Sequence, residues 1–264
     1  DDLVGAAFLP TDGQANPSDI TQALAKGARM SGVSIFEDTE VLDLEIDKGR
    51  IRAVITDRGR IECERVVVCA GQWTRTFAGR FGVNVPLVSV EHQYLITESF
   101  GVPSNLPTLR DPDRLTYYKE EVGGLVMGGY EPNPIPWALD GIPKDFHYTL
   151  LDSNFDHFEQ IMEQALVRVP ALQTAGVKQL LCGPESFTPD GNFILGEAPE
   201  LKNFFVGAGF NAFGIASAGG AGMALAEWVV KGEPPYDLWP VDIRRFGRPH
   251  FDTDWVRTRT LEAY

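Results

Sequence analysis

The sequence predicts an α/β fold with α+β character, and three observations carry this prediction. Two runs of β-branched and aromatic residues, at 66–71 and 203–207, have the composition of strands buried on both faces of a parallel sheet. Short strands of alternating polarity, joined by tight turns, begin at 41–69 and indicate antiparallel pairing. Two longer segments, 156–169 and 215–230, have the apolar spacing or the small residues of packed helices.

The composition limits the class of protein. With 264 residues, 23 Lys+Arg and 37 Asp+Glu, the chain is long enough for one or two domains and carries a net charge of −14. Such an acidic surface repels a phosphate backbone, so we expect no nucleic-acid partner. No apolar run approaches the roughly 20 residues of a transmembrane helix, so we expect no membrane span. The odd set Cys63, Cys69 and Cys182 favours a reducing compartment and lacks zinc-site spacing.

The chain begins without a start methionine or a secretory signal, and we expect it to be part of a longer protein. Turn formers at 10–17 precede a helix, for which Ser18 or Asp19 is the expected N-cap and Gly32 the expected stop. A short strand is expected at 33–36. The next expected elements are strands at 41–46, 51–56 and 61–69 and a helix that begins at 73–75.

The middle of the chain continues with strands and turns. Gly123-Gly124 is the expected turn of a hairpin, prolines at 132, 134 and 136 mark a loop, and Pro170 ends the helix at 156–169. In the last third, Gly232 closes the helix at 215–230. The strands expected in the middle part are 87–90, 93–97, 115–118 and 125–130.

A glycine-rich turn follows the second buried strand. Gly207, Gly209 and Ala212 match the relaxed fingerprint of a dinucleotide-binding turn. However, the turn continues to Gly214, and the acid that should end a second strand falls inside the following helix, at Glu227. A complete Rossmann start is therefore disfavoured. The helix start either packs small residues against a sheet or directs unpaired N–H groups at an electron-rich ligand, and the spacing leaves both open.

Several short motifs occur along the chain in a fixed order. They are Pro10-Thr-Asp-Gly13, Cys69-Ala-Gly-Gln-Trp73, Glu91-His-Gln-Tyr94, Thr188-Pro-Asp190, Ile194-Leu-Gly-Glu-Ala-Pro199, the turn from Asn203 to Gly214, and Asp242-Ile-Arg-Arg-Phe246. In this order they resemble the FAD-dependent D-amino-acid-oxidase-like family, and within it the sarcosine dehydrogenase and dimethylglycine dehydrogenase group. The resemblance covers nearly the whole chain, and its specificity lies in the ordered set.

The resemblance implies a partial FAD-binding Rossmann-like domain and a substrate domain built on a mixed or antiparallel sheet. The implied division is 1–85 for the remaining part of the FAD-binding domain, 86–180 for the substrate domain, and 181–264 for the return of the FAD-binding domain and the tail. The family's N-terminal GxGxxG unit is not in this sequence, so the chain looks like an interior fragment that is inactive by itself. A folate-binding region is expected after it in the parent protein.

The family pattern also implies which residues meet the cofactor. Val41 would contact the adenine through its backbone. Ala70, Gly71 and Trp73 would lie beside the pyrophosphate and the ribityl chain, although an ordinary strand-end turn also explains the first two. A helix start stabilises the negative charge of reduced flavin. The isoalloxazine would be bordered by Gly209, Phe210, Asn211, Gly214 and Ile215.

His92 and Tyr117 are the catalytic candidates that the resemblance implies. Amine oxidation by flavin requires a neutral nitrogen, and an imidazole or a phenol can position the amine and handle its proton. A lone strand histidine is more often structural, but the sequence around His92 favours the site. Lys119 shares a face with Tyr117 and is a candidate partner for a substrate carboxylate, unless it is only solvated. It stands where the family has Arg, and 182–187 lacks the carboxylate-binding Arg of relatives that oxidise D-amino acids.

The sequence therefore predicts an FAD-dependent amine dehydrogenase that oxidises an N-methyl amino acid, sarcosine or dimethylglycine, by hydride transfer to flavin. The product imine would release formaldehyde or be captured by folate, as in one-carbon metabolism. Two alternatives stay open: a non-enzymatic regulatory subunit of the pyruvate dehydrogenase phosphatase type with the same architecture, and an amine oxidase that uses oxygen. The expected compartment is the bacterial cytoplasm or the mitochondrial matrix. The electron acceptor, the attachment of flavin and the oligomeric state stay open.

Overall fold

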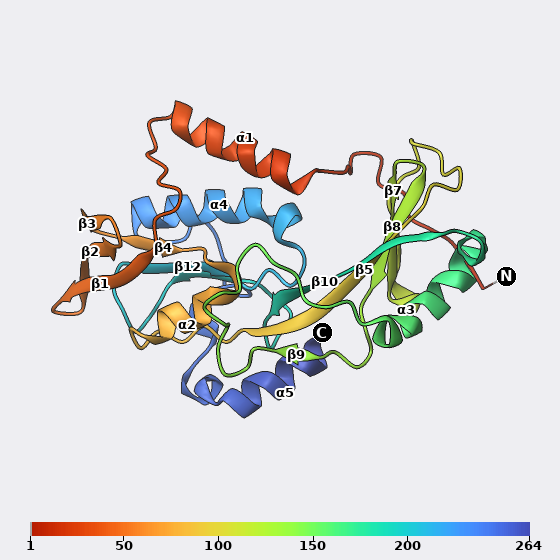
Figure 1. The fold of residues 1–264 in the computed structure, drawn as a ribbon. Helices are drawn as coiled ribbons and strands as arrows, with labels where there is room; N and C mark the ends of the chain where they lie inside the picture. The colour runs from red at the N-terminus through yellow and green to blue at the C-terminus, as the bar shows by residue number, and fades with distance from the viewer. Residues whose placement is uncertain (1) are drawn as a thin grey trace. The chain divides into compact units, whose positions relative to one another are not determined.

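A computed structural model describes residues 2–264, and the chain divides into two units (Figure 1). Unit 1 holds the segment that ends at Ile35 together with Tyr94–Gly129 and Glu159–Leu180. Unit 2 holds Phe36–Gln93, Tyr130–Phe158 and Leu181–Tyr264. Helices and strands are mixed throughout, which confirms the predicted α/β class with α+β character. The division of the chain at residues 85 and 180 stays a prediction.

The centre of unit 2 is a small sheet with the order β11-β12-β4. Strand β12 (Phe204–Ala208) pairs in parallel with β4 (Val66–Val68) and antiparallel with β11 (Ile194–Glu197). All of β12 is buried, as predicted, but Val67 of β4 is 43% exposed. The expectation that 66–71 is buried on both faces is therefore wrong, because β4 is the last strand in the order of this sheet.

Helix α4 (Gly214–Lys231) follows β12 and covers one face of this sheet (Figure 1). Its Leu225 and Trp228 pack against Leu195 and Phe205 of the sheet. The helix ends where Gly232 adopts a left-handed conformation, with φ +83°, as the sequence predicts. Of the small residues of α4, Ala221 and Ala224 are buried, whereas Gly219, Gly220 and Gly222 are exposed, so the glycines do not serve packing against this sheet.

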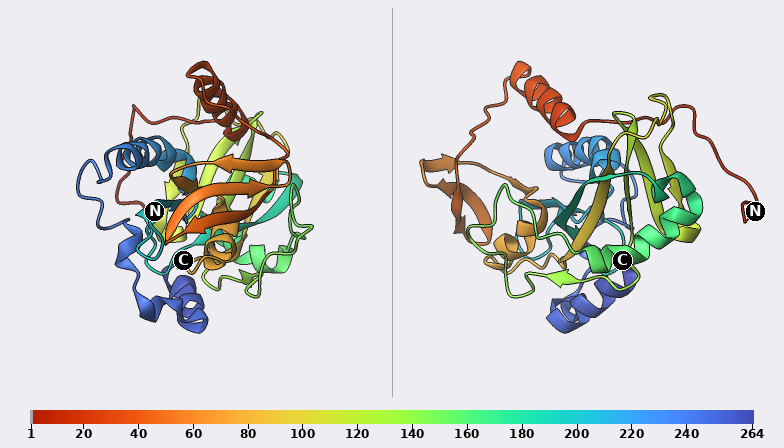
Figure 2. Two further views of the ribbon diagram at one scale, coloured as in Figure 1. Left: turned by 90° about the vertical axis from the view of Figure 1, so that its left-hand side faces the viewer. Right: turned by 45° about the vertical axis from the view of Figure 1, so that its right-hand side comes forward.

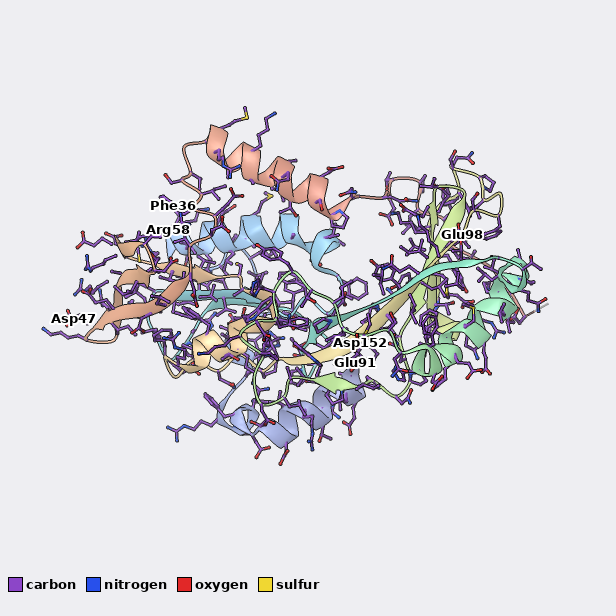
Figure 3. The ribbon with its side chains drawn as sticks, viewed as in Figure 1. Phe36, Asp47, Arg58, Glu91, Glu98 and Asp152 are labelled. Atoms are coloured by element: carbon purple, nitrogen blue, oxygen red, sulfur yellow. The ribbon has the colours of Figure 1, made fainter. Side chains whose placement is uncertain are left out.

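A second sheet of unit 2 is the predicted meander, which faces the viewer in the left view of Figure 2. It consists of β1 (Val41–Asp47), β2 (Arg50–Thr56) and β3 (Gly59–Glu62). The single strand expected at 61–69 is wrong, because this segment divides between β3 and β4, which belong to different sheets. Lys48 and Gly49 join β1 to β2 with positive φ at both positions, which is the geometry of a tight hairpin turn. Asp47 lies at the tip of this hairpin (Figure 3).

The larger sheet has the order β10-β5-β8-β7-β6, with β9 beside β5. Strand β5 (Val88–Thr97) is one continuous strand where two were expected, since Glu91 and His92 continue the extended backbone. The chain of β5 passes from unit 2 into unit 1 after Gln93. The other strands are β6 (Leu109–Asp111), β7 (Thr116–Glu121), β8 (Gly124–Gly129), β9 (Pro136–Trp137) and β10 (Val177–Phe187).

The first helix, α1 (Pro17–Met30), is capped differently from the prediction. The Asn16 Oδ1 atom accepts hydrogen bonds from the backbone N–H groups of Ser18, at 2.9 Å, and Asp19, at 3.1 Å. Asn16 is therefore the N-cap. Proline fits the first position of a helix, so the helix begins at Pro17, before the expected capping residues. The expected strand at 33–36 is wrong as well, since these residues form no ladder with any described strand.

The remaining helices complete the fold. Helix α3 begins close to the predicted position and ends before Pro170. Helix α5, near the end of the chain, was not predicted. No described helix combines the length and the apolar character that crossing a bilayer requires. The bounds are α2 Thr74–Gly79, α3 Phe155–Arg168 and α5 Thr253–Ala263, with 3-10 turns η1 Gly71–Trp73, η2 Pro112–Arg114, η3 Pro170–Gln173, η4 Ile243–Arg245 and η5 Arg248–Phe251.

Candidate functional site

The carboxyl ends of β4 and β12 bring two of the predicted cofactor segments to one edge of the sheet. Because these strands are parallel neighbours, the turn after each leaves the sheet at the same end. The Cys69 Sγ atom lies 3.2 Å from the position that a Cβ of Gly207 would occupy, so the residue after β4 packs against β12. Open α/β sheets bind ligands outside the carboxyl ends of their strands. Ala70 and Gly71 are exposed there, and Gly71 has φ +54°.

The turn after β12 is held in a left-handed conformation that only certain residues allow. A Cβ on Gly209, which has φ +65°, would lie 2.6 Å from side-chain atoms of both Leu87 and Thr188. The buried Asn211 has φ +51°, accepts a hydrogen bond from the Thr188 N–H at 2.8 Å, and donates to the Gly209 carbonyl at 2.7 Å. The side chain of Asn211 thus fixes the turn to the Thr188-Pro-Asp190 motif.

The start of α4 at this edge presents backbone donors. Phe213, the N-cap, provides no side-chain hydrogen bond to the first turn of the helix. Unpaired N–H groups at a helix start and the positive end of the helix dipole attract electron-rich groups. Ile215 is 51% exposed beside them, and Phe210 and Gly214 are half-buried. This donor set fits the electron-rich part of a flavin ring, and small residues at 70–71 leave room for close approach.

Of two other predicted cofactor residues, Trp73 lies near this edge and Val41 lies in a different sheet. Trp73, at the end of η1, follows Gly71 directly and is 43% exposed. Val41 begins β1 in the other sheet of unit 2 and is 41% exposed. The pairing of strands thus brings the segments 70–73 and 209–215 together, whereas it does not bring Val41 to them.

His92 lies in β5 within a buried cluster that the sequence did not reveal. Its Nδ1 atom is 2.8 Å from the Tyr264 Oη atom, and this hydroxyl donates to the Glu131 Oε2 atom at 2.5 Å. His92 is 7% exposed and Glu131 is 1% exposed. The Tyr264 ring packs edge-on against Phe187, with 4.7 Å between the ring centroids, and against Tyr130 at 5.6 Å. Three distant segments therefore meet at His92.

The charges of this cluster follow from its burial. Burial raises the pKa of the Glu131 carboxyl, but the nearby His92 and the Tyr264 hydroxyl outweigh burial and hold the pKa below its usual value. Burial raises the pKa of the Tyr264 phenol, and the negative charge of Glu131 raises it further. Glu131 is therefore ionised at neutral pH, and Tyr264 keeps its proton.

Tyr117 and Lys119 belong to β7 in unit 1. Tyr117 pairs with Gly128 of β8 and with Arg110 of β6, and it is half-buried. The Lys119 Nζ atom forms an ion pair with the Glu121 Oε2 atom at 3.0 Å, and both side chains are 40% exposed. The alternation of the strand places Tyr117 and Lys119 on one face, as predicted. Their joint action with His92 stays a prediction.

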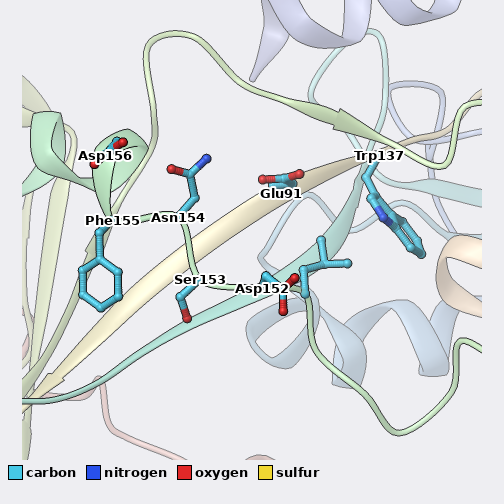
Figure 4. A pocket seen from close by; sticks show the side chains of 8 residues that line it. Glu91, Trp137, Asp152, Ser153, Asn154, Phe155 and Asp156 are labelled. Carbon is cyan, nitrogen blue, oxygen red and sulfur yellow. The ribbon is translucent and has the colours of Figure 1, made fainter.

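An acidic pocket of about 500 Å³ lies within unit 2 on the other side of β5 from His92, because Glu91 and His92 are consecutive strand residues. Figure 4 shows Glu91 between Trp137 at one end and Phe155 at the other. Burial raises the pKa of Glu91. Glu91 and Asp152, both labelled in Figure 3, line the same pocket. The pocket is lined by Glu91, Trp137, Leu151, Asp152, Ser153, Asn154, Phe155 and Asp156.

Metal ligands do not gather in any part of the chain from residue 2 to residue 264. Within that range, no group of three or more His, Cys, Asp or Glu side chains has an arrangement that could hold an ion. The cysteines at 63, 69 and 182 are free thiols.

Comparison with known proteins adds a family match over most of the chain. The family described as FAD dependent oxidoreductase matches residues 1–228, and the one described as FAD dependent oxidoreductase central domain matches residues 231–264. Mouse mitochondrial sarcosine dehydrogenase is 41% identical over 100% of this chain and 29% of its own length. The mouse mitochondrial pyruvate dehydrogenase phosphatase regulatory subunit is 40% identical over 99% of this chain and 30% of its own length.

A solved structure of another protein has a similar fold. The crystal structure of L-proline dehydrogenase from P. horikoshii superimposes with a TM-score of 0.77 at 26% identity, and the match covers 90% of this chain and 61% of that chain. The present chain thus spans about three tenths of the length of the curated relatives that it matches.

Proposed function

Because the chain belongs to the family of FAD-dependent oxidoreductases, we propose that it is part of an enzyme that oxidises an N-methyl amino acid of the sarcosine or dimethylglycine type. The identity of 41% to mouse sarcosine dehydrogenase, over the whole chain, supports this substrate class. Since the chain spans 29% of that relative, the activity is that of the longer protein.

The edge after β4 and β12 is the proposed place of the cofactor. Ala70, Gly71 and Trp73 would lie along its phosphate and ribityl part, and the segment 209–215 would border the ring. Bound flavin supplies the hydride acceptor for the carbon beside the substrate nitrogen. The uncapped N–H groups at the start of α4 would stabilise negative charge there. The backbone of Val41 is proposed to contact the adenine.

His92 is proposed to receive the amine. A substrate nitrogen must be neutral to give up a hydride from its methyl carbon, and imidazole is the side chain best suited to take that proton near neutral pH. Tyr117 is proposed to position the amine, and Lys119 to pair with the substrate carboxylate. The observation that carries the proposal is the buried and hydrogen-bonded state of His92, which fixes its ring.

Flavin reduction in the full-length protein tests this function. The purified protein should show flavin absorbance, which should bleach in a stopped-flow experiment when sarcosine or dimethylglycine is added without oxygen. Glycine, which lacks the N-methyl group, is the control substrate. The variant His92→Ala should keep its flavin and lose at least about a hundredfold in reduction rate. Protein without flavin, or flavin that N-methyl amino acids leave oxidised, would overturn the proposal.

A second function has a specific observation in its favour. The regulatory subunit of mouse pyruvate dehydrogenase phosphatase is 40% identical, nearly as close as the sarcosine enzyme. A non-enzymatic subunit would leave flavin unreduced in the experiment above. Formation of peroxide during turnover would instead identify an oxidase that passes electrons to oxygen. Both mouse relatives are named as mitochondrial, which supports the mitochondrial matrix as the compartment, and the cytoplasm of a bacterium is the alternative.

A further inference from the structure

Three polar groups from separate parts of unit 2 form one line of hydrogen bonds. The His92 Nδ1 atom lies 2.8 Å from the Tyr264 Oη atom, and the Oη atom lies 2.5 Å from the Glu131 Oε2 atom. The direct distance from His92 Nδ1 to Glu131 Oε2 is 3.7 Å, which is too long for a hydrogen bond. The phenol therefore links the imidazole to the carboxylate through its two hydrogen bonds.

The number of hydrogens in this line fixes the direction of each bond. An ionised carboxylate only accepts hydrogen bonds, and a phenol has one hydrogen to donate. Because Tyr264 donates its hydrogen to Glu131, its oxygen can only accept from the His92 Nδ1 atom. The neutral imidazole therefore carries its hydrogen on Nδ1 and its lone pair on Nε2.

We propose that Tyr264 and Glu131 are positioning residues that fix this tautomer of His92 and so make Nε2 the atom that takes the substrate proton. The inference rests on the proposed function, in which His92 receives the amine. In the step, the N–H bond of the substrate ammonium breaks, its proton forms a bond to Nε2, and the nitrogen keeps the electron pair. The positive charge passes to the imidazole, whose Nδ1 atom is 3.7 Å from the Glu131 carboxylate.

The cost of burying Glu131 argues against a merely structural role. Its side chain is fully buried, and its Oε1 atom has no hydrogen-bond partner among the described residues. A buried carboxylate with one unsatisfied oxygen destabilises a fold, and an apolar side chain would be the better choice for stability alone. A buried carboxylate that destabilises the fold can instead stabilise a positive charge that develops nearby during a reaction.

The surroundings keep the line of hydrogen bonds rigid. Phe187 and Tyr130 pack against the Tyr264 ring, and Tyr130 also contacts the His92 ring at 5.3 Å between centroids. A second carboxylate, Glu185 of β10, also acts on the cluster. Its negative charge, like that of Glu131, raises the pKa of the Tyr264 phenol. The Glu185 Oε2 atom is buried too and has no partner among residues 2–264. Together these groups keep the Tyr264 phenol protonated.

A double-mutant cycle in the full-length holoenzyme tests whether Tyr264 acts through His92. The variant Tyr264→Phe removes only the hydroxyl. Its limiting rate of flavin reduction should fall about 10–100-fold, with little change in the substrate concentration for half-maximal rate. In the His92→Ala background the same change should have no further effect, because the group it positions is gone. Flavin content and thermal melting check that each variant is folded.

Glu131 and a matched tyrosine complete the design. Glu131→Gln should slow reduction at least as much as Tyr264→Phe, since an amide can donate to the phenol and reverse the line, whereas Glu131→Asp should recover part of the rate. Tyr118→Phe is the control, because the buried Tyr118 hydroxyl bonds to Thr116 in unit 1. Equal slowing by Tyr264→Phe in both backgrounds, or a wild-type rate in the Glu131→Gln variant, would overturn the inference and leave the function standing. Wild-type flavin that stays oxidised would overturn the function itself.

Discussion

The backbone N–H of Thr188 donates a hydrogen bond to the Asn211 Oδ1 atom at 2.8 Å, and this bond joins two turns 23 residues apart in the sequence. Asn211 is buried and has a left-handed backbone, which asparagine tolerates better than most residues. The same side chain donates to the Gly209 carbonyl at 2.7 Å. One amide therefore determines the shape of the turn that precedes α4.

The variant Asn211→Ala should lower the free energy of unfolding by about 2–3 kcal/mol. The change removes both hydrogen bonds, leaves the buried Thr188 N–H without an acceptor, and puts alanine in an unfavourable conformation. Urea unfolding of the full-length protein measures the loss. Asn105→Ala, in an exposed loop, is the matched control and should stay within about 0.5 kcal/mol of the wild type. Similar values for both variants would contradict the role given to Asn211.

Gly209→Ala should destabilise the protein by about 1–3 kcal/mol and lower its flavin content. The added methyl group would lie 2.6 Å from atoms of Leu87 and Thr188, in a backbone with φ +65°. Absorbance of the purified protein and thermal unfolding give the two readouts. Gly27→Ala, in the exposed middle of α1 with open space around it, should instead stabilise by about 0.5–1 kcal/mol. Wild-type stability and flavin content in the Gly209→Ala variant would contradict the prediction that this turn requires glycine.

The ion pair of Asp190 with Arg245 should give the stability a pH dependence. Burial raises the pKa of Asp190, but two hydrogen bonds from Arg245, at 2.6 and 3.0 Å, hold it below its ordinary value of 3.8. Because the pKa in the folded state is below the ordinary value, the ion pair contributes its full stability above pH 3.8. This contribution is lost as the pH falls through the folded-state pKa.

The variant Asp190→Asn should therefore be less stable than the wild type at neutral pH, by about 1–3 kcal/mol, and the difference should shrink in acid. Urea unfolding at a series of pH values measures both effects. Asp47→Asn is the control, because Asp47 and its partner Arg52 are each 51% exposed and such a pair contributes about 0–1 kcal/mol. A difference for Asp190→Asn that is constant down to strong acid would contradict the assignment.

Cysteine alkylation should report where the cofactor lies without relying on turnover. Cys69 is exposed at the end of β4, although partial burial of its sulfur raises its pKa, whereas Cys182 is buried and burial raises its pKa to about 12. At mildly alkaline pH, peptide mass mapping should find Cys69 modified and Cys182 intact. Bound flavin should slow the modification of Cys69. Equal rates with and without flavin would place the cofactor elsewhere.

The sequence was sufficient for the elements whose signals are local. The β-branched run of β4, the buried β12, the turn that follows it and the end of α4 at Gly232 were all predicted, because composition and glycine positions determine them directly. The cap of α1 was assigned wrongly, since Asn16, Ser18 and Asp19 are all good capping residues and only the chain path selects among them.

The cluster around His92 could not be predicted from the sequence, for a physical reason. Its partners lie 39 and 172 residues away, and Glu131 comes from the end of a hairpin, where a carboxylate is usually solvated. Helix α5, which ends beside Tyr264, buries only Val256 and Thr260, so it shows little apolar periodicity. His92 was a candidate because of the motif around it, but no local pattern indicates that a phenol will hold its ring.

The long separation between His92 and Tyr264 has a consequence for the nascent protein. A ribosome that adds 5–20 residues per second makes the 172 intervening residues in roughly 10–35 s. During that interval β5 exists without the phenol that holds its imidazole. A growing chain can therefore acquire most of its sheets before it can acquire an oriented His92, because the hydrogen bond to Tyr264 forms only after α5 has left the ribosome and folded.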